Sequence, residues 1–305
     1  MQIRDLSANA KLEKIMLNRT ERKKFSNLTK LIAFCAIPLL SLSTMAKTII
    51  YVANSDTPSV SVFQLELSSG NLIQLQQQLL PNLVKLGPSS PMLITPNKQN
   101  LLVVNRGEPK VIFNFSIQAK SGQLSLKSKT ALPASMANIS TDKTGKLLLA
   151  ASYPQHLLSV HSLSEQGDVL PQQQVLTDLP NAHASLINKD NRFVFVPALG
   201  SDQIRQFKLN LETGQLSPNT PSEFQLEANT GPRHLVEHPN KNMVYLLGEY
   251  DATIHVFEYQ STAGTLAKIQ QIETAQTDSL KVNGLKHPNQ DTSKAKRFWA
   301  ADIHI

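Results

Sequence analysis

The sequence repeats itself with a period of 45 to 52 residues, measured on two separate markers. The first marker is a turn rich in Asp, Asn, Lys and Gly that precedes a short apolar run. These turns are spaced 45, 46 and 51 residues apart when aligned on Asn100, Gly145, Asn191 and Asn242. The second marker, Gly-x-Leu or Gly-x-Val, has spacings of 52, 45, 47 and 50 between Gly70, Gly122, Gly167, Gly214 and Gly264. Because both markers keep one period, we expect about five copies of one supersecondary unit.

The segments between the markers alternate apolar and polar residues. Residues 60–65 (Val-Ser-Val-Phe-Gln-Leu) and 204–209 (Ile-Arg-Gln-Phe-Lys-Leu) are examples. A period of two bounded by turn residues predicts strands. Four short strands in a unit of this length are typical of a β-propeller blade. We therefore predict an all-β propeller in which the Asp/Asn turn joins the two inner strands of each blade and the Gly turn joins the two outer ones.

The N-terminal segment has a different composition. Residues 1–30 carry eight basic and three acidic side chains, or +5 of the formal net charge of +7. Residues 31–46 are 16 uncharged residues, which is short for a membrane span of roughly 20. A basic region, an apolar run and small residues at Thr44 and Ala46 fit a secretory signal that is cleaved after Ala46.

These features divide the chain into a leader, 1–46, and a propeller domain, 47–305. We expect a periplasmic or secreted protein with no stable membrane span after cleavage. If translation starts elsewhere, for example at Met16, a cytoplasmic location follows instead.

Composition excludes several functions for the main domain. Beyond residue 30 the chain has 22 basic and 20 acidic residues, which gives no support to nucleic-acid binding. The single cysteine, Cys35, lies in the leader, so disulfides and thiolate metal sites are excluded from the domain. No histidine pair has metal-ligand spacing, and no phosphate loop, nucleophile elbow or dinucleotide fingerprint occurs. We expect no metal and no cofactor.

The two ends of the domain do not complete a blade. The first unit begins at Lys47 with what the register makes its second strand, so we expect no inner strand before it. Residues 301–305 (Ala-Asp-Ile-His-Ile) look like the inner strand of a further unit. We therefore interpret the chain as part of a longer propeller, and we expect its unpaired strand edges to favour self-association.

Three segments give the sequence a family resemblance. They are 181–185 (Asn-Ala-His-Ala-Ser), 231–240 (beginning Gly-Pro-Arg-His) and 297–305 (Arg-Phe-Trp-Ala-Ala-Asp-Ile-His-Ile). From about residue 48 to 305 the chain resembles the seven-bladed propeller 6-phosphogluconolactonases of bacteria, whose family includes fungal carboxy-muconate lactonising enzymes. The resemblance implies lactone chemistry, and it places the functional His, Arg and Glu of the family on His183, Arg233 and Glu249. A further family arginine, in a later blade, has no counterpart here.

The repeat register supports these positions independently. His183 and Arg233 each precede their Asp/Asn turn by six residues, so both mark the entry to an inner strand. Glu249 lies in the loop between the second and third strands of a blade, which opens on the same face as those entries. Arg106 and Tyr153 occupy the equivalent loops of earlier blades. An acid, a base and cations that converge near the axis are suited to ester hydrolysis.

The chemistry of a lactone assigns roles to these residues. Arg233 would hold the oxyanion or an anionic substrate group. Either Glu249 or His183 would take the proton from water, and the sequence leaves this choice open. Arg106, Tyr153 and His304 are candidates for substrate binding. The small-molecule partner would be a sugar lactone.

A second function class remains open at this stage. The chain would then be a non-catalytic exported propeller that binds or scaffolds, or an inactive remnant of the enzyme. Export argues against 6-phosphogluconolactone, a cytoplasmic metabolite, and in favour of an unphosphorylated lactone or a binding role.

Overall fold

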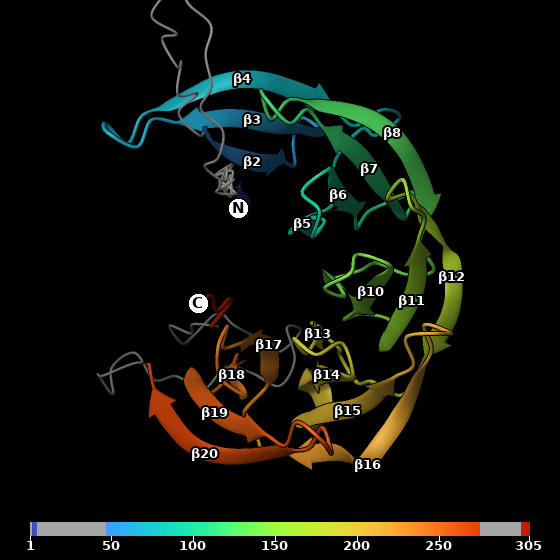
Figure 1. The fold of residues 1–305 in the computed structure, drawn as a ribbon, viewed down its shortest axis with the longest axis vertical. Coiled ribbons are helices and arrows are strands. Elements are labelled where there is room, and N and C mark those ends of the chain that lie inside the picture. Colours follow the sequence, from blue (N-terminus) through green and yellow to red (C-terminus); the bar gives the residue numbers. More distant parts are fainter. Residues whose placement is uncertain (1, 5–46, 275–299) are drawn as a thin grey trace, which may run out of the picture.

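Five four-stranded antiparallel sheets follow one another around a common centre in the computed structural model (Figure 1). The structure describes residues 2–4, 47–274 and 300–305. Within each sheet the strands run in chain order from the inside outward. The predicted all-β propeller with four-stranded blades is confirmed.

The blades are defined by the following strands. Blade 1 contains β1 (Gln2–Arg4), β2 (Thr48–Asn54), β3 (Ser59–Leu65) and β4 (Leu72–Leu79). Blade 2 contains β5 (Met92–Ile94), β6 (Asn100–Asn105), β7 (Val111–Ile117) and β8 (Leu124–Ala131). Blade 3 contains β9 (Asn138–Thr141), β10 (Leu147–Ser152), β11 (Leu157–Leu163) and β12 (Val169–Leu176). Blade 4 contains β13 (Leu186–Ile187), β14 (Phe193–Ala198), β15 (Gln203–Leu209) and β16 (Leu216–Gln225), with a 3-10 turn, η1 (Leu199–Ser201). Blade 5 contains β17 (Pro232–Glu237), β18 (Met243–Gly248), β19 (Thr253–Tyr259) and β20 (Leu266–Glu273).

The Asp/Asn turns recur because one side chain closes each of them. In blade 3 the buried carboxylate of Asp142 accepts hydrogen bonds from the amides of Thr144, Lys146 and Leu147 at 2.8–3.0 Å. In blade 4 Oδ1 of Asn188 accepts two amide hydrogen bonds at 2.9 Å in the same way. A short polar side chain that binds the backbone a few residues ahead is the usual device of such turns. The first repeat marker is therefore structural.

The Gly turns fasten each blade to the one before it. Gly122 has a φ of +73°, and a Cβ there would lie 2.6 Å from Cγ1 of Ile49 in blade 1. The hydroxyl of Tyr51 donates a 2.7 Å hydrogen bond to the carbonyl of Gly122. Only glycine tolerates both the left-handed backbone and the close approach. The second repeat marker thus records contact between blades.

Glutamines on the outer strands complete the joints between blades. Gln76 accepts from the amide of Leu124 at 2.7 Å and donates to its carbonyl at 2.8 Å. Gln174 forms the same pair of hydrogen bonds with Leu216, both at 2.8 Å. The Gln clusters therefore belong to fourth strands that bind the next blade.

The hydrophobic core lies between neighbouring blades. Four clusters of buried residues fill the four junctions of the five described blades. Between blades 4 and 5, for example, Phe195 packs with Phe257 and Tyr259. Burial on both faces explains why inner strands such as β6, β10 and β14 are buried along their whole length.

Two predictions about the ends of the domain are wrong. An inner strand does precede β2: β1 pairs with it antiparallel, with Ile3 opposite Ile50. The free edge of β2 offers unpaired backbone groups, and this short extended segment satisfies them. Residues 301–305 form no strand; the amide of Ala300 instead donates to the carbonyl of Glu249 at 3.2 Å, which holds this segment against blade 5.

Residues 5–46, with most of the leader, and 275–299 lie outside the described residues. No helix in the described part of the chain is long and apolar enough to cross a bilayer.

Candidate active site

The loop before β17 and the loop after β18 are joined through their backbones. The amide of Glu249 donates to the carbonyl of Gly231 at 2.8 Å, and Asp202 of blade 4 accepts from the amide of Gly231 at 2.8 Å. Gly231 has a φ of +61°, and a Cβ there would lie 2.5 Å from the ring of Tyr250. This glycine therefore allows the entry of an inner strand to approach the loop between strands two and three.

Arg233 and Glu249 form a close ion pair across this joint. Nε of Arg233 donates to Oε2 of Glu249 at 2.6 Å, and the side chains are 20% and 16% exposed. Burial raises the pKa of the Glu249 carboxyl, against the opposing charge and hydrogen bond of Arg233. The pair thus places a cation beside a carboxylate whose pKa is raised. It lies on the face of the propeller where the entries to the inner strands meet the loops between the second and third strands, and this face is called the mouth below.

A β-bulge directs two consecutive side chains of β17 to this mouth. In the pairing with β18, Pro232 lies opposite Gly248 but His234 lies opposite Leu247, so the register shifts at Arg233. In a regular strand, neighbouring side chains point to opposite faces, and a bulge removes that constraint. Arg233 therefore reaches Glu249, while His234 reaches His183, which belongs to the preceding blade, blade 4.

His183 lies at the entry to β13, and its ring contacts two others. Its Nδ1 is 3.1 Å from Nε2 of His234, and its ring centroid is 5.8 Å from that of Tyr153 in an edge-on arrangement. Burial, with added repulsion from Arg233, His234 and Arg106, lowers the pKa of His183 to about 2. His183 is therefore a neutral imidazole across the physiological range.

Arg106 and Tyr153 extend the site toward earlier blades. Burial and then the charge of Arg233 lower the pKa of Arg106, so the two guanidinium groups lie in each other's field. Nε of Arg106 is buried and has no hydrogen-bond partner among the described residues. Burial and the charge of Glu249 raise the pKa of Tyr153, which is hydrogen-bonded to Tyr250.

The C-terminal segment adds a carboxylate. Oδ1 of Asp302 is 2.5 Å from Nδ1 of His234, and its Oδ2 is 2.9 Å from Nε2 of His304. Burial would raise the pKa of Asp302, but the hydrogen bond and charge of His234 outweigh it and lower the pKa. His304 is 82% exposed, and among the described residues its hydrogen bond to the site is the one to Asp302.

Comparison with known proteins agrees with this architecture. The family model described as "Lactonase, 7-bladed beta-propeller" matches residues 78–305. The chain belongs to this family. It is 33% identical over 259 residues to a 6-phosphogluconolactonase of Yersinia enterocolitica and 32% identical to one of Yersinia pestis, covering 85% of this chain and 71% and 70% of theirs. The solved structure of a periplasmic gluconolactonase of Pseudomonas aeruginosa has a TM-score of 0.66 at 20% identity, covering 76% of this chain and 69% of that one.

In this lactonase propeller five of the six predicted site residues come together: Arg106, Tyr153, His183, Arg233 and Glu249. His304 is linked to them only indirectly. The sequence prediction missed His234, Tyr250 and Asp302. Two signals were available: His234 stands in the Gly-Pro-Arg-His segment, and Asp302 stands two residues before His304. No group of three or more His, Cys, Asp or Glu in the described residues is placed to hold a metal ion.

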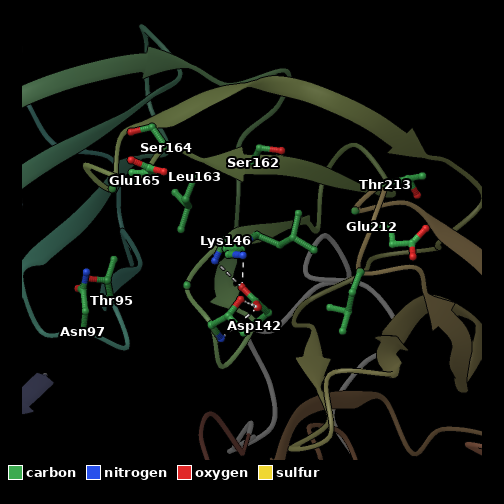
Figure 2. A pocket seen from close by; sticks show the side chains of 16 residues that line it. Thr95, Asn97, Asp142, Lys146, Ser162, Leu163, Ser164, Glu165, Glu212 and Thr213 are labelled. Carbon is green, nitrogen blue, oxygen red and sulfur yellow. Dashed lines mark hydrogen bonds between the residues drawn. The ribbon is translucent and has the colours of Figure 1, made fainter.

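A hollow lies at the opposite end of the blades from Arg233 and Glu249. Its volume is about 600 Å³, and it is lined by the Asp/Asn turns of blades 2 and 3 and the Gly turns of blades 3 and 4. Figure 2 shows Asp142 there with its carboxylate bonded within its own turn. The carboxylate of Asp142 already closes a turn, and the other charged residues that line this hollow, Lys146, Glu165 and Glu212, form no ion pair with one another in the described part of the chain. Arg233 and Glu249 are paired at 2.6 Å, so the mouth that they form is the better candidate.

Proposed function

We propose that the chain hydrolyses a sugar lactone at the mouth formed by Arg233, Glu249 and His183. The observation that carries the proposal is the 2.6 Å Arg233–Glu249 pair beside a neutral His183, in a chain of the lactonase propeller family. The names of the curated relatives support 6-phosphogluconolactone, and the solved neighbour's name supports gluconolactone, as substrates to be tested.

The reaction needs a base, an oxyanion partner and a proton donor for the leaving oxygen. Water attacks the lactone carbonyl and gives a proton to the Glu249 carboxylate, whose raised pKa brings it closer to neutrality. The guanidinium of Arg233 stabilises the resulting oxyanion. When the tetrahedral intermediate collapses, the ring C–O bond breaks and Glu249 returns the proton to the departing alkoxide. The product is the open hydroxy acid, which loses its own proton to solvent.

His183 is better suited to hydrogen bonding than to proton transfer. A pKa of about 2 makes its imidazole a weak base before substrate binds. A neutral ring still accepts one hydrogen bond and donates another. We therefore assign the base to Glu249 and the positioning of water or a substrate hydroxyl to His183.

Acid release in a pH-stat tests the proposal. Glucono-δ-lactone and its 6-phosphate should both be assayed above their spontaneous rates. The matched control is a second Arg–Glu pair of blade 4, Arg205 and Glu223 at 3.7 Å, which lies away from the mouth. Loss of turnover in Arg233→Ala but not in Arg205→Ala supports the proposal. Lactone binding by calorimetry without hydrolysis would favour the non-catalytic propeller and overturn it.

We also propose that the chain is exported. The basic segment and the 16-residue uncharged run support this, since together they resemble a signal peptide. Cleavage after Ala46 would remove β1 and leave blade 1 with three strands. N-terminal sequencing of protein from the periplasm should begin at Lys47; full-length protein recovered from the cytosol would refute export. Self-association through strand edges stays a prediction, which light scattering would check.

A further inference from the structure

Three side chains form a continuous line from the C-terminal segment into the candidate site. Asp302 lies 2.5 Å from Nδ1 of His234, and Nε2 of His234 lies 3.1 Å from Nδ1 of His183. The three residues come from the C-terminal segment, the bulge of β17 and the entry to β13. Side-chain contacts over 51 and 68 residues of sequence require the blades to hold these groups in place.

The hydrogen bonds set the direction of every proton in this line. Burial lowers the pKa of His234 although Asp302 opposes the shift, and His183 has a pKa of about 2, so both rings are neutral and carry one N–H each. The Asp302 carboxylate can only accept, so the N–H of His234 is on Nδ1. Its Nε2 is then an acceptor, so His183 must donate from Nδ1. The remaining nitrogen of His183, Nε2, is left with a lone pair.

We propose that Asp302 and His234 are positioning residues that fix the tautomer of His183 and keep its Nε2 as a hydrogen-bond acceptor at the mouth of the propeller. Nε2 points away from His234, because the two ring nitrogens diverge. It forms no hydrogen bond with the described part of the chain, and His183 is only half-buried. It can therefore receive the O–H of water or of a substrate hydroxyl.

Asp302, His234 and His183 are together called the relay below. Their hydrogen bonds have a consequence that packing alone would not have. In free histidine the Nε2–H tautomer is the preferred one. If Asp302 loses its carboxylate, His234 has no acceptor for Nδ1–H and changes to the Nε2–H form. That proton then points at His183, whose N–H must move to Nε2. A substitution at Asp302 should therefore change the tautomer of His183 without touching it.

Long-range ¹H–¹⁵N correlation spectra of the histidine-labelled full chain test this directly. The chain has eight histidines, and His183→Gln and His234→Gln variants assign the two signals. We expect the Nδ1–H tautomer for both rings in the unmodified chain, and the Nε2–H tautomer for both in Asp302→Leu. His304→Leu, which removes the partner of the other carboxylate oxygen, should leave both tautomers unchanged. An Nε2–H tautomer of His183 in the unmodified chain would overturn the proposal, as would an unchanged tautomer in Asp302→Leu that retains the native melting temperature.

The catalytic meaning of the relay rests on the proposed function. In a pH-stat, Asp302→Leu and His234→Phe should lower kcat at least tenfold with KM little changed, and neither should add to the loss in His183→Phe. His238→Phe, directly after the same strand and away from the mouth, is the matched control. Additive losses would overturn the relay. Tautomers as expected in a chain that hydrolyses no sugar lactone would support the relay and sink the lactonase proposal.

Discussion

Replacing Arg233 by Ala should damage the site in two separable ways. The first is loss of the oxyanion partner, which in other enzymes costs about 100- to 1,000-fold in kcat, or about 3–4 kcal/mol. The second is loss of the cation that keeps Glu249 ionised. The pair is 2.6 Å apart and mostly buried, so its carboxylate has little solvent to replace the missing charge.

The second effect predicts a change in the pH profile. Burial already raises the pKa of Glu249, and Arg233 opposes that shift through charge and a hydrogen bond. Without Arg233 the pKa rises further, so the acid limb of kcat, where Glu249 is protonated and inactive, moves to higher pH. Of the other groups at the mouth, His183 is neutral, Arg106 stays positive, and Tyr153 is protonated because its pKa is raised. His234, whose pKa is lowered from that of free histidine, also titrates on the acid side, so the loss of this limb in Glu249→Gln is what would assign it to Glu249.

The folding stability lost in Arg233→Ala should also be larger at high pH. Because the folded pKa of Glu249 lies above its unfolded value, the native state is relatively favoured below the unfolded pKa, and this advantage is lost as the pH rises through the folded pKa. Arg233→Ala should therefore destabilise the fold more at pH 8 than at pH 4, by about 1–3 kcal/mol after allowance for partial exposure.

A pH-stat series from pH 5 to 9 and denaturant unfolding at pH 4 and pH 8 measure these effects, with Arg205→Ala as the control. A kcat loss below tenfold would refute the role of Arg233 as oxyanion partner. A loss of constant size across the whole pH range would refute its effect on the pKa of Glu249.

Three further predictions concern the site and the repeat. Glu249→Gln should abolish the acid limb and lower kcat at least 100-fold, as expected for loss of a general base, whereas Glu223→Gln should change neither; equal losses in the pH-stat would contradict this. Gly264→Ala should destabilise the fold by about 2–4 kcal/mol in denaturant unfolding, because its Cβ would overlap the ring of Phe193, whereas Gly70→Ala, with the same left-handed backbone and no neighbour within 4 Å, should cost about 1 kcal/mol. Arg106→Ala should raise KM for the phosphorylated lactone at least tenfold more than for glucono-δ-lactone; equal shifts in KM would show that Arg106 does not bind the phosphate.

The periodic part of the molecule was predictable from the sequence. The Asp/Asn and Gly turns recur because each performs the same local task in every blade. Their spacing therefore predicts at which end of the blade each strand begins and ends. This is why Arg233 and Glu249, 16 residues apart, could be assigned to one face before any contact was known.

The parts that break the period were not predictable. The bulge at Arg233 inserts one residue into the pairing of β17 with β18 and turns His234 toward His183, and no turn residue in the sequence marks it. Asp302 reaches His234 from a segment that forms no strand, so period-two reasoning gave it the wrong structure. The inner strand β1 comes from a segment whose composition indicated a leader, and nothing in that composition marked residues 2–4 as partners for the free edge of β2.

The charge balance at the mouth narrows the class of substrate. Arg233 is paired with Glu249, and Asp302 is bonded to His234 and His304, so neither carboxylate is directed to Arg106. Arg106 keeps its charge while burial and Arg233 both oppose that charge, and its Nε lacks a partner among the described residues. Arg106 is half-buried and its terminal nitrogen donates to the carbonyl of Pro88 at 3.3 Å, so an anion that binds its Nε would stabilise the guanidinium further. The site therefore favours a lactone that carries a phosphate or a carboxylate. If the protein is exported, such a lactone has to be available outside the cytoplasm.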